Sequence, residues 1–293
     1  MYTMKKFLFI IASSFALLSC DYVSAPVQTG NTGGPGPNDT LPKRVVLLEE
    51  ATGHTCTNCP SAAATIQTLK STYGEQLVPI AIHYGWFAEP CPPHPLPNGA
   101  PSGSFSEDLR CPEGSDYDVL YSIFNAPPAA MVNRLGYPAD HIKSQGQWAG
   151  LIDSLVNTQP LASLDINHTY DTTTRALNIS VDGQFLQAAS GDFNLVVMLV
   201  EDGIVGWQVD GTNYIPNYQF NHVLRACVNT PGSITGEQVA TGSVAAFTNF
   251  NWTLSGSYTV SNLINHHNCN LVVFLYNFNT KEAIQAGEVH LIP

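Results

Sequence analysis

Residues 44–60, RVVLLEEATGHTCTNCP, decide the fold of this chain. The apolar run at 45–48 is short and continuous, which is typical of a strand buried in a parallel sheet. It leads into a loop that carries two cysteines separated by two residues, Cys56 and Cys59. From about residue 58 to 73, apolar side chains recur at helical spacing. The stretch therefore predicts a strand, a C-x-x-C loop and a helix that opens at the motif.

The position of this motif at the start of a helix favours thiol chemistry. Unpaired N–H groups and the helix dipole stabilise an anion there, so we predict that Cys56 has the lower thiol pKa and acts as the nucleophile. Cys59, one turn later, would resolve the mixed disulfide. His54 either adds positive charge beside Cys56 or is an ordinary polar loop residue. A static disulfide and a metal site are the competing interpretations, although zinc sites usually have a second C-x-x-C or an H-x-x-x-H, which this sequence lacks.

The pattern of apolar residues changes near Pro160. Before it, the sequence predicts strands at 77–83 and 129–133, helices at 116–124 and 141–157, and a Pro-rich insertion at 86–116. After it, roughly eight short segments alternate apolar and polar residues and are separated by turn-forming residues, which is typical of an antiparallel sandwich. We therefore expect an α/β domain at 43–159 and an all-β domain at 160–293.

The N-terminus has the layout of a signal peptide, with two lysines before an apolar run at 7–18. The run ends in LLSC, which resembles the lipobox of bacterial lipoproteins. That resemblance implies a signal peptide at 1–19, cleavage before Cys20 and acylation of its thiol, which anchors the protein to a membrane. The alternative is a simple secretory leader whose cysteine is incidental. Residues 20–42 are rich in Gly, Pro, Thr and Asn and predict a flexible tether behind the anchor.

The charge of the chain excludes several function classes. Eleven basic residues against 23 acidic ones give a formal net charge of −12, and only 12% of residues are charged. Nucleic-acid binding depends on clustered Lys and Arg, so no nucleic-acid partner is predicted. The same balance argues against adsorption to an anionic membrane surface.

Six cysteines remain when Cys20 is set aside as the lipid anchor. An even number in an oxidising compartment suggests disulfides, but six cysteines allow 15 connectivities, and sequence alone does not choose among them. Proximity along the chain favours pairing Cys56 with Cys59, and it favours two structural disulfides, Cys91–Cys111 and Cys227–Cys269.

The order strand, C-x-x-C helix, strand, insertion, helix, proline, strand, turn and helix resembles the thioredoxin fold over residues 43–157. This resemblance implies that Pro128 is a cis-proline opening the strand that faces the disulfide, where an incoming peptide pairs as an added strand; an ordinary turn is the alternative. It also implies that Glu50, six residues before the first cysteine, is a buried acid that accepts the proton of Cys59. The alternative for Glu50 is a solvated strand end, which we expect Glu49 to be. The predicted fold class is an α/β thioredoxin-like domain followed by an all-β antiparallel sandwich domain.

Two segments resemble the Bacteroidota twenty-eight-kilodalton outer-membrane protein family: EEATGHTCTNCP at 49–60 and NYQFNHVLR at 217–225. They lie in different predicted domains, so the likeness extends over nearly all of the mature chain. It implies the two-domain architecture and a place at the outer membrane of the cell envelope. It implies no particular reaction.

The leading hypothesis is a lipid-anchored envelope protein that exchanges disulfides with the thiols of envelope proteins. The catalytic set would be Cys56, Cys59, Pro128, Glu50 and His54, with no cofactor and no metal. The rival is a binding or adhesion lipoprotein, with an unidentified protein ligand, that keeps this fold as a scaffold and its C-x-x-C as a static bridge. A third option is a metal chaperone that uses the two motif cysteines and a nearby histidine.

Overall fold

The computed structural model of the chain describes residues 42–230 and 233–292, so the predicted leader, Cys20 and the tether up to residue 41 lie outside the described residues. Its helices are α1 (Cys59–Tyr73), α2 (Glu113–Tyr121) and α3 (Gln145–Val156). Its strands are β1 (Val46–Thr52), β2 (Leu77–His83), β3 (Ala129–Val132), β4 (Ala162–Asp171), β5 (Ala176–Phe185), β6 (Ala189–Ser190), β7 (Phe193–Glu201), β8 (Ile204–Asp210), β9 (Asn213–Phe220), β10 (Val223–Cys227), β11 (Glu237–Ala240), β12 (Ser243–Val244), β13 (Asn249–Thr253), β14 (Tyr258–Thr259), β15 (Cys269–Asn277) and β16 (Ala283–His290).

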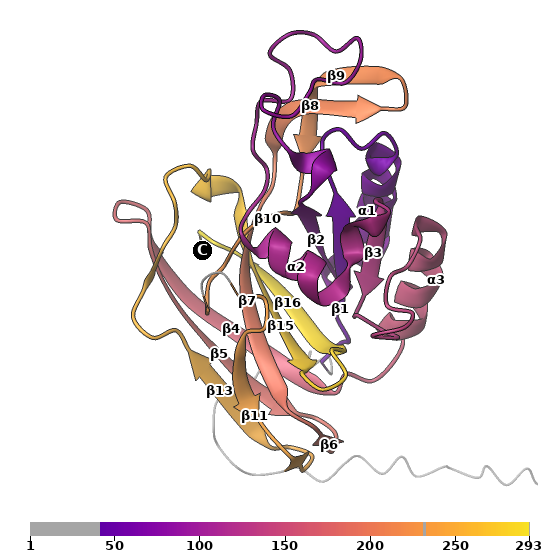
Figure 1. Cartoon of the computed structure of the whole chain (residues 1–293). Coiled ribbons are helices and arrows are strands. Elements are labelled where there is room, and N and C mark those ends of the chain that lie inside the picture. The colour runs from indigo at the N-terminus through magenta and orange to yellow at the C-terminus, as the bar shows by residue number, and fades with distance from the viewer. Residues whose placement is uncertain (1–41, 231–232, 293) are drawn as a thin grey trace, which may run out of the picture. The chain divides into compact units, whose positions relative to one another are not determined.

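One large sheet contains strands from both halves of the chain, in the order β16-β15-β7-β10-β2-β1-β3 (Figure 1). β1 and β2 are parallel, and β3 runs antiparallel to β1. The two halves meet where β10 pairs with β2 through Val223 and Ala81, and where the Ala81 N–H donates to the His222 carbonyl at 2.8 Å. The change of pattern at Pro160 therefore falls between α3 and β4 within a shared sheet. The division into two independent domains stays a prediction.

A smaller antiparallel sheet packs on one face of the large sheet. It has the order β13-β5-β14, with β4 also paired to β5. Alternate residues of β7 explain the arrangement, because successive side chains of a strand point to opposite faces. Leu195, Val197 and Leu199 belong to the core shared with β5, whereas the intervening Val196, Met198 and Val200 belong to a second core. The predicted β-rich architecture is thus confirmed for the described residues.

The helices cover both faces of the sheet around β1. Leu48 packs in one core with α1 and α3, while its neighbour Leu47 packs in the opposite core with α2 (Figure 1). α3 begins with a capping box in which Ser144 and Gln147 satisfy each other's backbone N–H groups. The predicted helices are confirmed with shifted ends, since α2 begins at Glu113 and α3 begins at Gln145.

Glu49 is not the solvated strand end that the sequence suggested. Its side chain is fully buried and forms an ion pair with Arg134, at 2.8 Å from Nε and 2.6 Å from Nη2. The Tyr117 hydroxyl donates to the same carboxylate. A buried charge requires a partner that supplies its lost hydration. Arg134, in the turn after β3, is that partner. The sequence around Glu49 gave no sign of this ion pair.

The two predicted structural disulfides are wrong, because Cys91, Cys111, Cys227 and Cys269 are all free thiols. β7 lies between β10 and β15, and Cys227 pairs with Met198 of β7 whereas Cys269 pairs with Glu201. Two strand spacings across the sheet and three residues along β7 therefore separate the two Cα atoms, about 14 Å in all, which exceeds the roughly 7 Å that a disulfide spans. Cys91 packs with Phe105, whereas Cys111 packs against the core that contains Cys227. Separation along the chain was a poor guide because the sheet order rearranges the neighbours.

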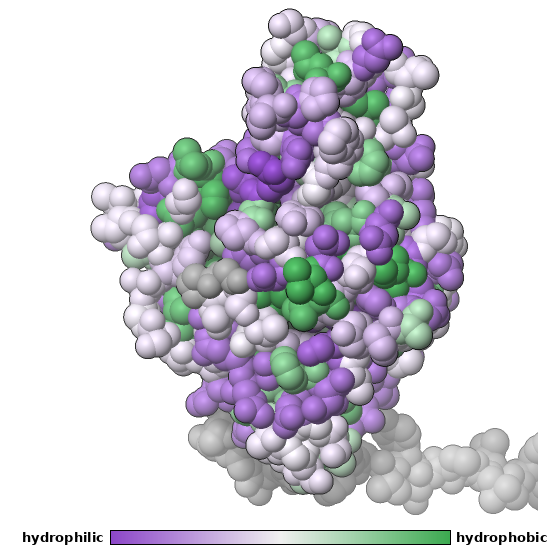
Figure 2. All heavy atoms as spheres, in the orientation of Figure 1, coloured by the Kyte–Doolittle hydropathy of each residue, from purple (hydrophilic) through white to green (hydrophobic). Residues whose placement is uncertain are grey.

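Hydrophobic residues on the face drawn in Figure 2 form separate small groups among hydrophilic ones. The exposed large side chains include Trp86 beside the motif and Leu263 on the sandwich side. Within residues 42–230 and 233–292, no helix is long and apolar enough to cross a membrane.

Candidate functional site

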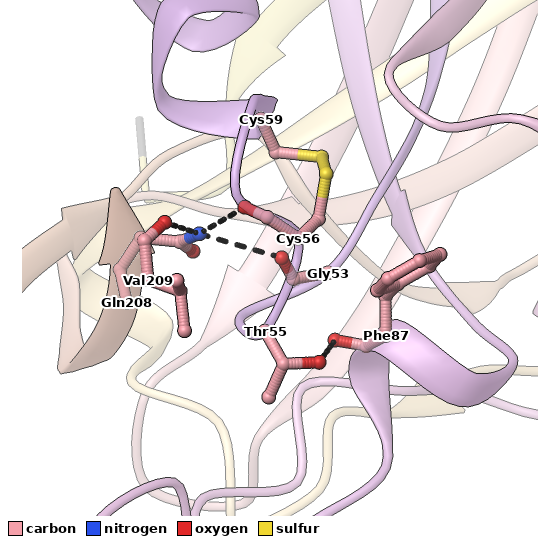
Figure 3. Close-up of a disulfide and its surroundings, with 7 residues drawn as sticks. All are labelled: Gly53, Thr55, Cys56, Cys59, Phe87, Gln208 and Val209. Atoms are coloured by element: carbon pink, nitrogen blue, oxygen red, sulfur yellow. Dashed lines mark hydrogen bonds between the residues drawn. A yellow bond between two sulfur atoms is a disulfide. The ribbon is translucent and has the colours of Figure 1, made fainter. Parts of the chain in front are cut away.

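The C-x-x-C is a disulfide in the structure. Cys56 and Cys59 are joined by an S–S bond of 2.09 Å, with their Cα atoms 5.4 Å apart (Figure 3). α1 begins at Cys59 with Asn58 as its N-cap, so Cys56 lies in the turn before the helix and not at its first residue. The bond nevertheless holds the Cys56 sulfur beside the first turn, where the free N–H groups of the helix stabilise a thiolate.

The motif loop is held from two sides. On one side, the Gln208 side chain of β8 donates to the Cys56 carbonyl at 3.0 Å, and the Val209 N–H donates to the His54 carbonyl at 2.8 Å. On the other side, the Thr55 hydroxyl donates to the Phe87 carbonyl at 3.1 Å (Figure 3), and the Thr55 N–H donates to the same carbonyl at 3.0 Å. Each cysteine is left only 3% exposed.

Gly53 is required where the loop passes Phe87. A Cβ atom at Gly53 would lie 2.3 Å from the Phe87 carbonyl oxygen, closer than real contacts allow. The absence of a side chain therefore lets the insertion pack directly on the motif loop.

A cavity of about 620 Å³ lies beside the disulfide, on the side of Cys59. α1, β1, β2 and the segment from β8 to the start of β10 supply its walls. Its apolar lining comes mainly from Pro60, Ala63, Ala64, Ile66, Pro79, Ile80, Ala81 and Phe220, and its polar lining from Glu50, Thr52, Gln67, His83, Gln208, Tyr218, Gln219, Asn221 and His222. This size and mixture are typical of a small-molecule site.

Two buried titratable groups in this cavity lack partners. Glu50 is 2% exposed and its Oε1 has no hydrogen bond; burial raises the pKa of this carboxyl to about 8. His83 is also 2% exposed and neither ring nitrogen is bonded; burial lowers the pKa of this imidazole to about 3. At neutral pH, Glu50 therefore carries a proton that it can donate, and His83 is uncharged.

His54 does not supply a positive charge beside Cys56, the first of the two roles suggested by the sequence. Its Nε2 lies 3.0 Å from the Glu89 carbonyl, and its ring packs edge-on against Phe105. Burial lowers the pKa of His54, so the ring is uncharged at neutral pH. The geometry favours the polar loop interpretation, in which His54 ties the motif loop to the insertion.

The peptide bond between Pro127 and Pro128 is cis. β3 starts directly after Pro128, and its first residue, Ala129, pairs with Ala51 of β1. Pro128 thus lies near the end of β1 that leads into the motif loop. Its contact with a substrate stays a prediction.

The cavity also contains residues that the sequence did not single out as site residues. His83 ends β2 next to Thr52 of β1, and the ends of parallel strands meet at one sheet edge, which was a usable signal. Tyr218, Phe220 and His222 lie within 217–225, the second of the two segments that carried the family resemblance. The two segments therefore converge on one cavity. No sequence signal marked Gln208, whose role depends on where the β8–β9 hairpin folds.

A model of the family described as outer membrane protein Omp28 matches residues 116–291, which is more than half of the chain. The chain belongs to the Omp28 family. Membership places this Omp28 protein at the outer membrane of the cell envelope. The matched region includes the 217–225 segment and begins after the C-x-x-C, so it bears on location more than on thiol chemistry.

Solved structures resemble this Omp28 family member at low sequence identity. HBP35 of Porphyromonas gingivalis has a TM-score of 0.61 and 16% identity, over 85% of this chain and 75% of that chain. That likeness concerns the fold alone. A structural-genomics protein from Agrobacterium tumefaciens has a TM-score of 0.47 and 13% identity, over 85% of this chain and 95% of that chain. A domain of the outer membrane lipoprotein Omp28 from P. gingivalis has a TM-score of 0.29 and 20% identity, over 46% of this chain and 92% of that chain. None of the curated proteins matches the chain.

Proposed function

We propose that this Omp28 family member is a lipid-anchored outer-membrane lipoprotein that exchanges disulfides with the thiols of envelope proteins. Cys20 carries the lipid, and residues 43–159 form a thioredoxin-like domain. When the pair is reduced, Cys56 attacks a disulfide of the partner protein and Cys59 resolves the mixed disulfide. Two protons and two electrons leave the pair as the partner is reduced, and a dithiol or two thiols reverse the process.

The observation that carries this proposal is the position of the disulfide between a helix start and a cavity with a protonated carboxyl. Cys59 and Glu50 line the same cavity, and a carboxyl with a pKa near 8 can give a proton to a thiolate or accept one at physiological pH. The parallel β1–α1–β2 unit and the antiparallel β3 after cis Pro128 agree with the strand order expected of a thioredoxin-like domain. In this proposal Pro128 and the backbone before it position the partner peptide, since the outer edge of β3 is already bonded at Ala130 to Lys143.

One observation favours a second candidate function, a binding lipoprotein that uses this fold as a scaffold and keeps the disulfide as a static bridge. Gln208, Val209 and Phe87 fasten the motif loop, and each cysteine is only 3% exposed. A static disulfide in such a clamp would stabilise a binding lipoprotein without exchanging electrons.

The redox midpoint of the Cys56–Cys59 pair separates the two candidates. The intact protein is equilibrated in dithiol buffers of known potential, and the pair is quantified by alkylation and mass spectrometry. Exchange predicts a midpoint above about −300 mV and a mixed disulfide trapped on Cys56 in the Cys59→Ser variant. A midpoint below that value, with nothing trapped, would establish the static bridge.

A further inference from the structure

Only one of the two cysteines of the disulfide lines the cavity. Cys59 lines the 620 Å³ cavity, and Cys56, whose backbone is held by Gln208, does not. A molecule in the cavity therefore meets the motif from the Cys59 side. The volume lies within the range of sites for small molecules and is too small for a folded protein.

Unsatisfied polar atoms point to a guest in this cavity. Glu50 Oε1 and both ring nitrogens of His83 are buried without hydrogen bonds. Buried polar groups in native proteins are nearly always bonded, and each one left open costs free energy. A guest with a hydroxyl or an amino group would supply the missing partners, while its hydrocarbon part would contact Ile66, Ile80 and Phe220.

The charges around the cavity restrict the guest further. Among the described residues that line it, none is Lys or Arg, and Glu50 is the single carboxylic acid. Burial lowers the pKa of both lining histidines, His83 and His222, so neither supplies a positive charge at neutral pH. Glu50 is protonated at neutral pH and offers no negative charge either. A carboxylate, a phosphate or an ammonium group would therefore enter without a counter-charge, whereas an uncharged group would not face that cost.

We infer that this cavity is the entry site for a small uncharged thiol that reduces the Cys56–Cys59 disulfide, an inference that rests on the proposed function. The thiol gives its proton to solvent, and its sulfur attacks Sγ of Cys59. The bond between Cys56 and Cys59 breaks, and its electron pair goes to Sγ of Cys56, beside the first turn of α1.

A second thiol completes the reduction. Its thiolate attacks the sulfur of the first thiol, so that the two small molecules leave as one disulfide. Sγ of Cys59 takes the electron pair and receives the proton of the Glu50 carboxyl, which solvent then restores. Two small thiols are oxidised for each protein disulfide reduced, so no other reductant is required.

The test compares three thiols of similar size and different charge: cysteamine, 2-mercaptoethanol and 3-mercaptopropionate. The rate at which each reduces the oxidised intact protein is divided by its rate with an oxidised peptide of residues 54–61, which removes differences in intrinsic reactivity. We expect the normalised rate of the neutral thiol to exceed those of the cationic and anionic thiols by about tenfold or more, because the cavity offers neither charge a partner.

Matched variants on α1 localise the effect. Ala64→Trp fills the cavity wall and should lower the normalised rates of all three thiols at least severalfold, whereas Thr72→Trp, two turns further along and outside the cavity, should leave them unchanged. Equal normalised rates in the wild-type protein would overturn the inference without any variant. So would identical behaviour of the two tryptophan variants. A pair that behaves as the static bridge in the redox titration and traps no partner would instead overturn the proposed function itself.

Discussion

At the scale of single residues, Glu50 makes a prediction about pH. Folding raises the pKa of its carboxyl from about 4.5 to about 8, so the folded protein binds this proton more tightly than the unfolded chain does. The free energy of unfolding should therefore fall as pH rises between those values, by a few kcal/mol at most. Glu50→Gln, which cannot ionise, should remove this decline. Urea unfolding of both proteins at pH 5 and pH 8 measures it, and parallel pH profiles would show that Glu50 is not buried as described.

Glu49 makes a separate prediction about stability. Glu49→Ala leaves the fully buried Arg134 guanidinium without its carboxylate, so we expect a loss of about 3–5 kcal/mol in the free energy of unfolding. The control is Asp108→Ala, which removes an ion pair to Arg110 whose two side chains are 50% and 33% exposed and should change stability by about 1 kcal/mol or less. Similar losses in the two variants would contradict the buried pair.

At the scale of elements, the hairpin of β8 and β9 holds the motif loop through hydrogen bonds from Gln208 and Val209. Gln208→Ala removes the amide that donates to the Cys56 carbonyl at 3.0 Å and leaves that carbonyl without this donor. We expect about 1–3 kcal/mol lower stability of the oxidised protein, together with faster reduction of the disulfide by dithiothreitol. Asn217→Ala on the neighbouring strand is the control, because its side chain is exposed and lies outside the cavity lining. A reduction rate equal to that of the control would mean that the Gln208 hydrogen bond does not protect the disulfide.

At the scale of the whole molecule, the shared sheet predicts that the two halves of the chain depend on each other. Leu47 and Val78 of the first half share a core with Met198 and Phe274 of the second half. A fragment of residues 43–159 would expose that core and the β2 edge that β10 covers, so it should unfold without cooperativity and bind a hydrophobic dye. Cooperative, two-state unfolding of the fragment would instead support two independent domains.

The free cysteines provide a second prediction at this scale. Alkylation of the unfolded protein without a reductant should label Cys91, Cys111, Cys227 and Cys269, and leave Cys56 and Cys59 unlabelled until the disulfide is reduced. Mass spectrometry of the digest counts the labels. Fewer than four labelled sites among these cysteines would reveal a further disulfide.

The sequence alone determined the local features of this protein. The apolar run before the motif, the helical spacing after it and the alternation beyond Pro160 predicted β1, α1 and the antiparallel strands, because each pattern depends on neighbours within a few residues. The segments at 49–60 and 217–225 carried the family resemblance, but nothing in the sequence showed that they line one cavity. Only the tertiary structure decided that convergence, the burial of Glu49 against Arg134 and the separation of Cys227 from Cys269. The physical reason is that sheet order sets which distant residues become neighbours, and burial then sets their charge and reactivity.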